Sequence, residues 1–295
     1  MKMESSERAN AASTSLFKDI AEEVFSRYRR NWKPRTVKVN RAYLRNQIMP
    51  WFGDRPIADI TRSEVQDWFA GLNETPAAAD RSVPVLSVVL REAEIYGYRK
   101  NNSNPCAGLR RYRRRGRERF LSVDEIRRLG ASLLELEADG QLPAAVVRLL
   151  LLTGCRQGEI RTLLWHDYRN GDLFLRDSKT GPRTVWLSSS ARLVLDGLPK
   201  TDSWVFPTKR GGRPMSTDTL YGFWNKLREA AAMPSLRLHD LRHSYASFAL
   251  REGETVLTIG RLLGHRDPST TLKYIHLADT MARDAVEAVG AALER

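Results

Sequence analysis

Cysteine and long apolar runs are both scarce in this sequence. Its 295 residues include two cysteines, Cys106 and Cys155, which lie far apart. A disulfide-stapled secreted fold is therefore excluded, and a reducing compartment is expected. The most apolar stretch, residues 144–152, contains Arg148 and is too short to span a bilayer. The polar N-terminus has no signal-peptide core, so we expect a cytoplasmic protein.

Acidic residues are also few compared with basic ones. The chain has 35 aspartates and glutamates against 48 lysines and arginines, a net charge of +13 and a pI of about 10.0. A protein this basic usually has a polyanionic partner, and nucleic acid is the commonest. An anionic membrane surface is the rival, but it requires a basic amphipathic helix or a lipid anchor, and the sequence has no convincing example of either. The 42% hydrophobic content is enough for a packed core.

The first third of the chain has a helical pattern. Residues 1–12 are polar, and we expect them to be disordered, whereas 13–100 should form a small helical domain. Apolar residues recur at three- and four-residue steps over residues 16–28, which predicts one buried helix face. Thr61 followed by Glu64 predicts a capping box at the start of another helix.

A basic stretch follows at 101–119, and we interpret it as a linker. Between residues 99 and 119, nine basic residues stand against Glu118 alone, and asparagine, proline and glycine interrupt regular structure. Such a run is either a solvated segment or a nucleic-acid contact, and its position between two folded parts favours DNA. The candidate DNA-binding residues are Arg110, Arg111, Arg113, Arg114, Arg115 and Arg117.

Residues 120–295 are predicted to form a second, mostly helical domain. Short β-branched and aromatic runs at 173–175 and 184–187 predict two antiparallel strands joined by a hairpin. The whole chain is therefore expected to be mainly α with a small antiparallel β-sheet. Helices are expected at about 122–137, 143–153, 189–197, 216–232, 240–251, 255–263, 269–276 and 279–293.

A few polar residues of the second domain are suited to phosphate chemistry. His239 and Arg242 are three residues apart and so share a helix face, where guanidinium and imidazole groups can bind phosphate oxygens. Taken alone, such a pair is more often a surface ion pair or a capping group. His239 and His243 also have the spacing of a zinc site, but no third ligand is evident. Tyr274 is either a core residue or a nucleophile that needs cations or a base near its phenol.

Three further residues extend this set. Arg156 follows a Thr-Gly-Cys segment, and Glu159 is placed to orient its guanidinium. Lys179 lies at the tip of the predicted hairpin, where a lysine is either solvated or able to reach a DNA groove. Cys155 has an apolar flank and is expected to be a packing residue rather than a nucleophile.

Four motifs together resemble the tyrosine recombinases, also called the phage integrase family. They occur in the family's order, and the pattern at 36–69 is similar to the family's helical core-binding (SAM-like) domain. The motifs are TGCRQGEI at 153–160, SKTGPRTVWL at 178–187, HDLRHSYAS at 239–247 and LLGHRDPSTTLKYIH at 262–276.

The resemblance implies a role for each candidate residue. Tyr274 would attack the scissile phosphate, giving a 3′-phosphotyrosine and a free 5′-hydroxyl, and Lys179 would protonate the leaving oxygen. Arg156 and Arg242 would clamp the non-bridging oxygens. The remaining residues would support these groups: His239 in proton transfer at the tyrosine, His265 in binding the phosphate and Glu159 as the acidic support.

The resemblance also implies how the protein works on DNA. No metal, ATP or other cofactor is needed, because protein cations stabilise the developing charge and the covalent intermediate conserves the phosphodiester energy. The expected partner is double-stranded DNA at specific recombination sites, bound by a homotetramer with a dimer on each site. The C-terminal helix at 279–293 would dock on a neighbour, and an accessory directionality factor is conceivable.

The leading hypothesis is a site-specific integrase encoded by a phage or another mobile element. A chromosome or plasmid dimer resolvase of the same family is the alternative. A type IB topoisomerase shares the chemistry, but the chain is small for one. A catalytically silent DNA-binding regulator would not need Tyr274.

Overall fold

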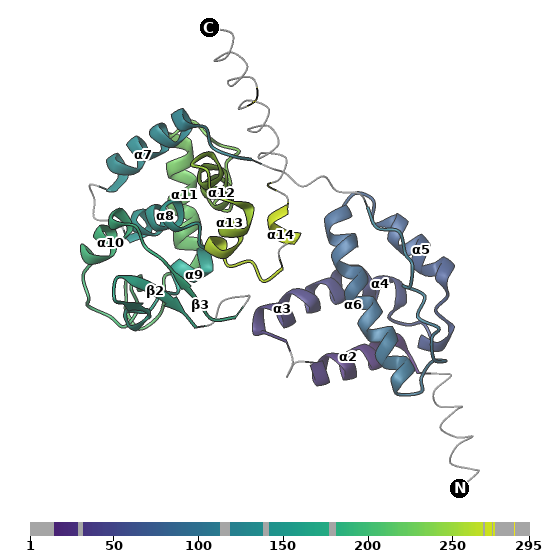
Figure 1. Cartoon of the computed structure of the whole chain (residues 1–295). Coiled ribbons are helices and arrows are strands. Elements are labelled where there is room, and N and C mark those ends of the chain that lie inside the picture. The colour runs from purple at the N-terminus through teal and green to yellow at the C-terminus, as the bar shows by residue number, and fades with distance from the viewer. Residues whose placement is uncertain are drawn as a thin grey trace. The chain divides into compact units, whose positions relative to one another are not determined.

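The chain is mostly helical and carries one three-stranded antiparallel sheet, which confirms the predicted fold class. The computed structural model describes residues 15–28, 32–112, 119–137, 142–176, 181–267, 269–272, 274 and 286. It divides into two units, Met1–Arg115 and Gly116–Arg295 (Figure 1). Within the described residues, no helix is long and apolar enough to cross a membrane.

Unit 1 is built from helices around one apolar core. The predicted apolar stripe of α2 is confirmed, since Phe17, Ile20 and Val24 are buried. The predicted capping box is also present, because the Thr61 hydroxyl accepts from the Glu64 amide and the Glu64 carboxylate accepts from the Thr61 amide. The helices of this unit are α2 (Phe17–Tyr28), α3 (Pro34–Tyr43), α4 (Met49–Phe52), α5 (Arg62–Gly71) and α6 (Pro76–Ile95).

A π-helical segment, Leu44–Ile48, lets the helical run continue past Pro50. Proline has no amide hydrogen and crowds the carbonyl four residues earlier, so helical pairing fails there. The chain widens by one residue instead, and the Met49 amide donates to the Leu44 carbonyl. The Trp68 indole donates to the Gln47 carbonyl at 2.7 Å, so this carbonyl of the widened turn has a hydrogen-bond donor. The helical path therefore reaches Phe52 through α4 rather than ending at Pro50.

The first part of the stretch expected as a linker packs on unit 1. Cys106 is buried in the unit 1 core, and Tyr112 stacks on Phe69 with ring centroids 4.7 Å apart. The Tyr112 amide also donates to the Asp80 carboxylate at 3.2 Å. The boundary between the units, at 115/116, falls inside the expected linker, and residues 113–118 lie outside the described part of the chain.

Unit 2 is organised around α8, which is buried along most of its length. In this unit α8 (Leu142–Thr153) contacts α10 (Ser189–Asp196), α11 (Thr217–Ala230) and α12 (Asp240–Arg251). A capping box is present at the start of α7 (Val123–Glu137), since the Ser122 and Glu125 side chains each accept from the other's amide.

The small sheet lies at one edge of unit 2 (Figure 1). It consists of β1 (Tyr168–Arg169), β2 (Asp172–Leu175) and β3 (Arg183–Val185), in the order β1-β2-β3. Both predicted strands are confirmed, and Phe174 pairs with Thr184. The sequence did not predict β1, because two residues are too few to show an alternating pattern.

Three C-terminal helices and Tyr274 form a smaller cluster in unit 2. In Figure 1, α12 lies beside α13 (Val256–Leu263), and α13 lies beside α14 (Ser269–Leu272). Apolar side chains of α12 and α13 form a cluster that includes Tyr274. The helix predicted at 269–276 is assigned to Leu272, and the one predicted at 279–293 lies outside the described residues apart from Val286.

Candidate active site

Arg242 links two segments of the candidate site that are far apart in the sequence. Its side chain is buried, and its two terminal nitrogens donate to the Gly154 and Leu263 carbonyls, each at 2.7 Å. Gly154 lies two residues before Arg156, and Leu263 lies two residues before His265. The Arg242 guanidinium therefore holds against α12 the two segments that carry Arg156 and His265, which are also candidate phosphate ligands.

Arg242 remains a cation in this position. Burial, together with the nearby charge of Arg156, lowers its pKa to about 10, which is still well above neutral pH. Each buried arginine hydrogen is costly unless it has an acceptor, and the two carbonyls provide acceptors without neutralising the charge. The positive charge thus remains available to an anion.

Glu159 is the acidic centre of the site. Its carboxylate accepts from the Arg156 amide and from Arg156 Nη1, both at 2.9 Å, and from Arg183 Nη2 at 3.0 Å. Burial by itself would raise the pKa of Glu159, but the Arg183 charge and the hydrogen bonds from both arginines outweigh burial and lower it. Glu159 is therefore a carboxylate that fixes Arg156 at the start of α9 (Gln157–Arg161).

Arg183, on β3, connects the hydrogen-bond network of Glu159 to the end of α13. Its side chain is 10% exposed. Besides binding Glu159, it donates to the Leu262 carbonyl at 3.1 Å and to the Cys155 sulfur at 3.4 Å. Cys155 is buried here with a free thiol, and burial raises its pKa. This environment suits a packing residue and disfavours a thiolate nucleophile.

His265 is oriented by a threonine of α14. Its Nδ1 lies 2.7 Å from the Thr271 hydroxyl, and its amide donates to the Gly260 carbonyl at 2.9 Å. Thr271 is buried. A hydroxyl that donates to Nδ1 places the ring hydrogen on Nε2, the form in which imidazole can donate to a phosphate oxygen.

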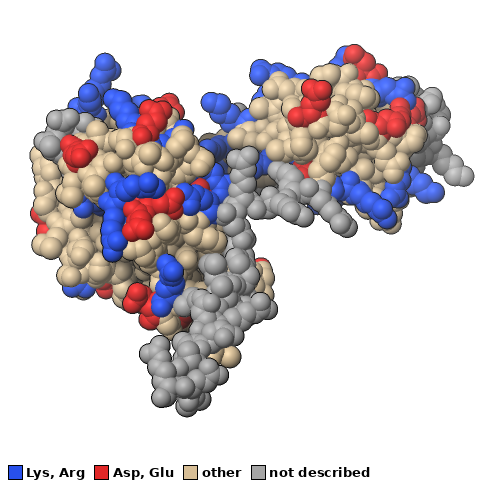
Figure 2. Space-filling model, turned by 90° about the horizontal axis from the view of Figure 1, so that it is seen from above, with Lys and Arg blue, Asp and Glu red and all other residues tan. Residues whose placement is uncertain are grey.

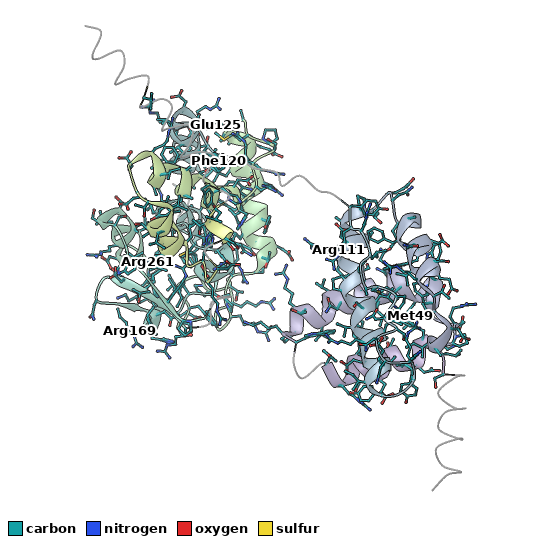
Figure 3. All side chains as sticks on the ribbon, turned by 45° about the vertical axis from the view of Figure 1, so that its right-hand side comes forward. Met49, Arg111, Phe120, Glu125, Arg169 and Arg261 are labelled. Atoms are coloured by element: carbon teal, nitrogen blue, oxygen red, sulfur yellow. The ribbon has the colours of Figure 1, made fainter. Side chains whose placement is uncertain are left out.

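The Tyr274 hydroxyl is placed against α12. The side chain is 1% exposed, and its oxygen lies 2.9 Å from Nδ1 of His243. His243 in turn lies one turn after His239, with ring centroids 5.0 Å apart in an edge-to-face arrangement. Phe120 covers both rings, with centroids 6.4 Å from His243 and 6.5 Å from Tyr274. Figure 3 shows Phe120 and Glu125 in the same part of unit 2.

The structure brings most of the sequence-predicted residues together. Arg156 pairs with Glu159, and Arg242 binds the carbonyls of Gly154 and Leu263, which lie two residues before Arg156 and His265. Tyr274 belongs to the apolar cluster of α12 and α13. His239 is an exposed residue at the N-cap of α12. Lys179 lies outside the described residues.

The remaining sequence predictions concern DNA contacts and metal. Arg110 and Arg111 are exposed, and Figure 3 shows Arg111 on unit 1. Arg113, Arg114, Arg115 and Arg117 lie outside the described residues. In the described parts of the chain, no group of three histidine, cysteine or acidic side chains is arranged to hold a metal ion.

Sequence reasoning gave no catalytic role to two residues of this site. Arg183 is inside a quoted motif, but its partners Cys155, Glu159 and Leu262 lie in two other segments and cannot be read from local spacing. His243 was considered only as a zinc ligand. The signal available for it was that it follows Arg242 directly on the helix that carries the site.

Comparisons with known proteins identify the family of the chain. The phage integrase family model matches residues 119–281, and the phage integrase central domain model matches 17–112. The putative prophage phiRv2 integrase of Mycobacterium tuberculosis (strain ATCC 25618 / H37Rv) is 28% identical over 288 residues, covering 88% of this chain and 76% of the relative. Tyrosine recombinase XerA of Saccharolobus solfataricus is 27% identical over 270 residues, covering 83% and 90%.

Solved structures show the same fold. A lambda integrase dimer bound to a COC′ core site matches with a TM-score of 0.74 and 21% identity, over 91% of this chain and 79% of that one. The Tn1549 transposon integrase in complex with circular intermediate DNA matches with a TM-score of 0.68 and 15% identity, over 86% and 94%. Because the family model alone covers more than half of the residues, the chain belongs to the phage integrase family and is a tyrosine-type site-specific recombinase.

Proposed function

We propose that the chain is the integrase of a phage or another mobile element, and that it cuts and rejoins DNA through a 3′-phosphotyrosine. The observation that carries the proposal is the position of Arg242, whose two hydrogen bonds hold the segments of Arg156 and His265 on the helix that also contacts Tyr274. A nucleophile beside fixed cations is the arrangement that phosphoryl transfer needs, because charge develops on the non-bridging oxygens.

In the proposed reaction, the Tyr274 oxygen attacks the scissile phosphorus and the bond to the 5′-oxygen breaks. Arg156 and Arg242 bind the non-bridging oxygens, and His265 donates to one of them. Lys179 protonates the leaving oxygen, and Glu159 keeps Arg156 in place. His239 assists proton transfer at the nucleophile. The phosphotyrosine conserves the energy of the broken bond, so religation needs neither ATP nor a metal ion.

The proposed partner is double-stranded DNA bound at specific recombination sites. Similar structures include a lambda integrase dimer on a core site and a lambda integrase tetramer on a Holliday junction, which supports assembly on DNA. We propose a homotetramer with a dimer on each site and the segment 279–293 docked on a neighbour. An accessory directionality factor would decide between integration and excision, and a DNA substrate implies action in the cytoplasm.

A dimer resolvase of the same family is the second candidate. It is favoured by the similarity to XerA and to tyrosine recombinase XerC of Oceanobacillus iheyensis, which is 27% identical over 288 residues. The two functions differ in their DNA sites. An integrase recombines the junctions that flank its own element, whereas a resolvase recombines two copies of one chromosomal or plasmid site.

A covalent-adduct assay tests the proposal. We expect the protein, incubated with nicked duplexes from the DNA that flanks its gene, to form a protein–DNA adduct that survives SDS. Tyr274→Phe should abolish the adduct and retain DNA binding, because the hydroxyl is lost and the cations remain. Tyr221→Phe, at an exposed position of α11, is the matched control and should react like the wild type.

Three results would contradict the proposal. An adduct formed by Tyr274→Phe would show that another residue is the nucleophile. Relaxation of any supercoiled plasmid, without a requirement for the flanking sites, would indicate a type IB topoisomerase. Specific binding with no adduct by the wild type would favour a silent regulator.

A further inference from the structure

The Tyr274 hydroxyl has a histidine directly beside it, and the role of that histidine is not part of the proposed reaction. His243 Nδ1 lies 2.9 Å from the phenol oxygen, within the range for proton transfer along a hydrogen bond. The aromatic ring of Phe120 lies against both side chains. The hydroxyl therefore lies against an imidazole nitrogen at a position where Tyr274 is only 1% exposed to solvent.

The backbone fixes His243 firmly. It follows Arg242, whose guanidinium is held by the Gly154 and Leu263 carbonyls, so the same turn of α12 is tied to two other segments. Among the described residues, the rings of Tyr274 and His239 lie against His243. The Arg242 guanidinium is directed to the two carbonyls.

A phenol in this position needs a proton acceptor. Its ordinary pKa is about 10, so a tyrosine near neutral pH attacks only as its proton leaves. A neutral imidazole, with an ordinary pKa of about 6.5, is the side chain best matched to that transfer. His239, which the sequence assigned to this task, lies one helical turn earlier and is exposed.

We propose that His243 is a catalytic residue, the general base that takes the Tyr274 proton at Nδ1. As the O–P bond forms and the P–O5′ bond breaks, the proton moves from Tyr274 to Nδ1, and Lys179 supplies the proton for the 5′-oxygen. The resulting imidazolium returns its proton to Tyr274 when the 5′-hydroxyl attacks the phosphotyrosine. This inference rests on the proposed function and gives His243 the role of proton acceptor at Tyr274 that was assigned there to His239.

His243→Asn is the decisive variant. The asparagine amide can occupy the position of Nδ1 and keep a hydrogen bond to Tyr274, but it cannot accept a proton. In single-turnover cleavage of a nicked site, we expect it to react about 10²–10⁴-fold more slowly than the wild type, the usual contribution of a general base. DNA binding and thermal stability should be unchanged. His166→Asn, at a half-exposed position on the 3₁₀ turn Trp165–Asp167, should behave like the wild type.

Three further measurements separate a base from a structural contact. The wild-type rate should rise with pH through the range in which an imidazole loses its proton, and His243→Asn should lose that rise. His243→Ala should regain activity with added imidazole. A substrate with sulfur in place of the bridging 5′-oxygen needs no leaving-group acid, so it should restore a Lys179→Ala variant and leave the His243→Asn defect in place.

Several outcomes would overturn the inference. Wild-type or faster cleavage by His243→Asn would mean that the hydrogen bond with His243 only holds Tyr274 in an inactive position before cleavage. A defect that imidazole does not relieve in His243→Ala, together with lost stability, would mean that His243 only supports the fold. The absence of any adduct with the wild-type chain is a separate result, which rejects the proposed function itself.

Discussion

Arg183 joins three parts of the candidate site with one side chain. It binds Glu159, the Leu262 carbonyl and the Cys155 sulfur, so β3, α13 and the segment before α9 share its guanidinium. Without it, Glu159 would keep the two bonds to Arg156 but lose its second arginine. Arg183 should therefore act through Arg156, as a positioning residue that need not touch the DNA.

We expect Arg183→Met to impair cleavage more than it impairs folding. Removing a buried charged donor should lower the free energy of unfolding by about 2–3 kcal/mol, because Glu159 and a carbonyl lose their partner. Cleavage of a nicked site should slow while DNA binding is retained. Arg169→Met, on β1 at an exposed position labelled in Figure 3, is the control and should cost little in denaturant titrations. Equal losses in the two variants would refute the positioning role.

Residue types were easier to predict than their partners. The motifs supplied Arg156, Arg242, His265 and Tyr274 because phosphate chemistry restricts which side chains are useful. The contact between His243 and Tyr274 spans 31 positions, and the pair Arg183–Glu159 spans 24. Pairings at such separations depend on how α12, α13 and β3 pack, and no local pattern contains that information.

The C-terminal end of α13 depends on a glycine. Gly264 has φ of +67°, and its amide closes the helix by donating to the Arg261 carbonyl. A Cβ added to Gly264 would lie 2.4 Å from Cδ of Arg183. The left-handed cap thus allows Arg183 to approach and also directs the chain toward His265.

Comparing Gly264→Ala with Gly253→Ala should separate these two effects. Gly253 also has a left-handed backbone, with φ of +89°, but a Cβ there meets no atom within 4 Å. Alanine in that conformation costs about 1–2 kcal/mol at either position. At Gly264, displacing Arg183 should add about 1–3 kcal/mol, as overpacking usually does. Denaturation would measure both. Only Gly264→Ala should also slow cleavage, and equal costs would show that Arg183 moves aside freely.

Helix boundaries followed from capping and proline chemistry more reliably than from periodicity. The capping boxes at Thr61 and Ser122 and the first-turn proline of α3 are local signals, and the structure has all of them. The π-helical turn before Pro50 was not predictable in the same way. It is stabilised by the Trp68 indole, which comes from a different helix.

At the scale of the whole molecule, the excess of basic residues is the dominant property. The face shown in Figure 2 has lysine and arginine side chains on both units, with acidic side chains interspersed. Many of the described cations are neutralised locally, as Lys18 is by Asp54 at 2.7 Å. Composition alone therefore predicts a polyanionic partner but does not identify the cations that meet it.

The salt dependence of DNA binding identifies those cations. Each phosphate contact releases condensed counterions, so the slope of log K against log salt should fall by about 0.9 for every contacting cation removed. We expect Arg110→Ala with Arg111→Ala to flatten the slope measured on flanking DNA, because both residues are exposed and unit 1 ends just beyond them. Lys18→Ala removes a cation already paired with a carboxylate and should leave the slope unchanged. An unaltered slope in the double variant would place Arg110 and Arg111 in solvent. The sequence-independent part of the affinity would then have to come from other basic residues, with Arg113, Arg114, Arg115 and Arg117 the next to replace.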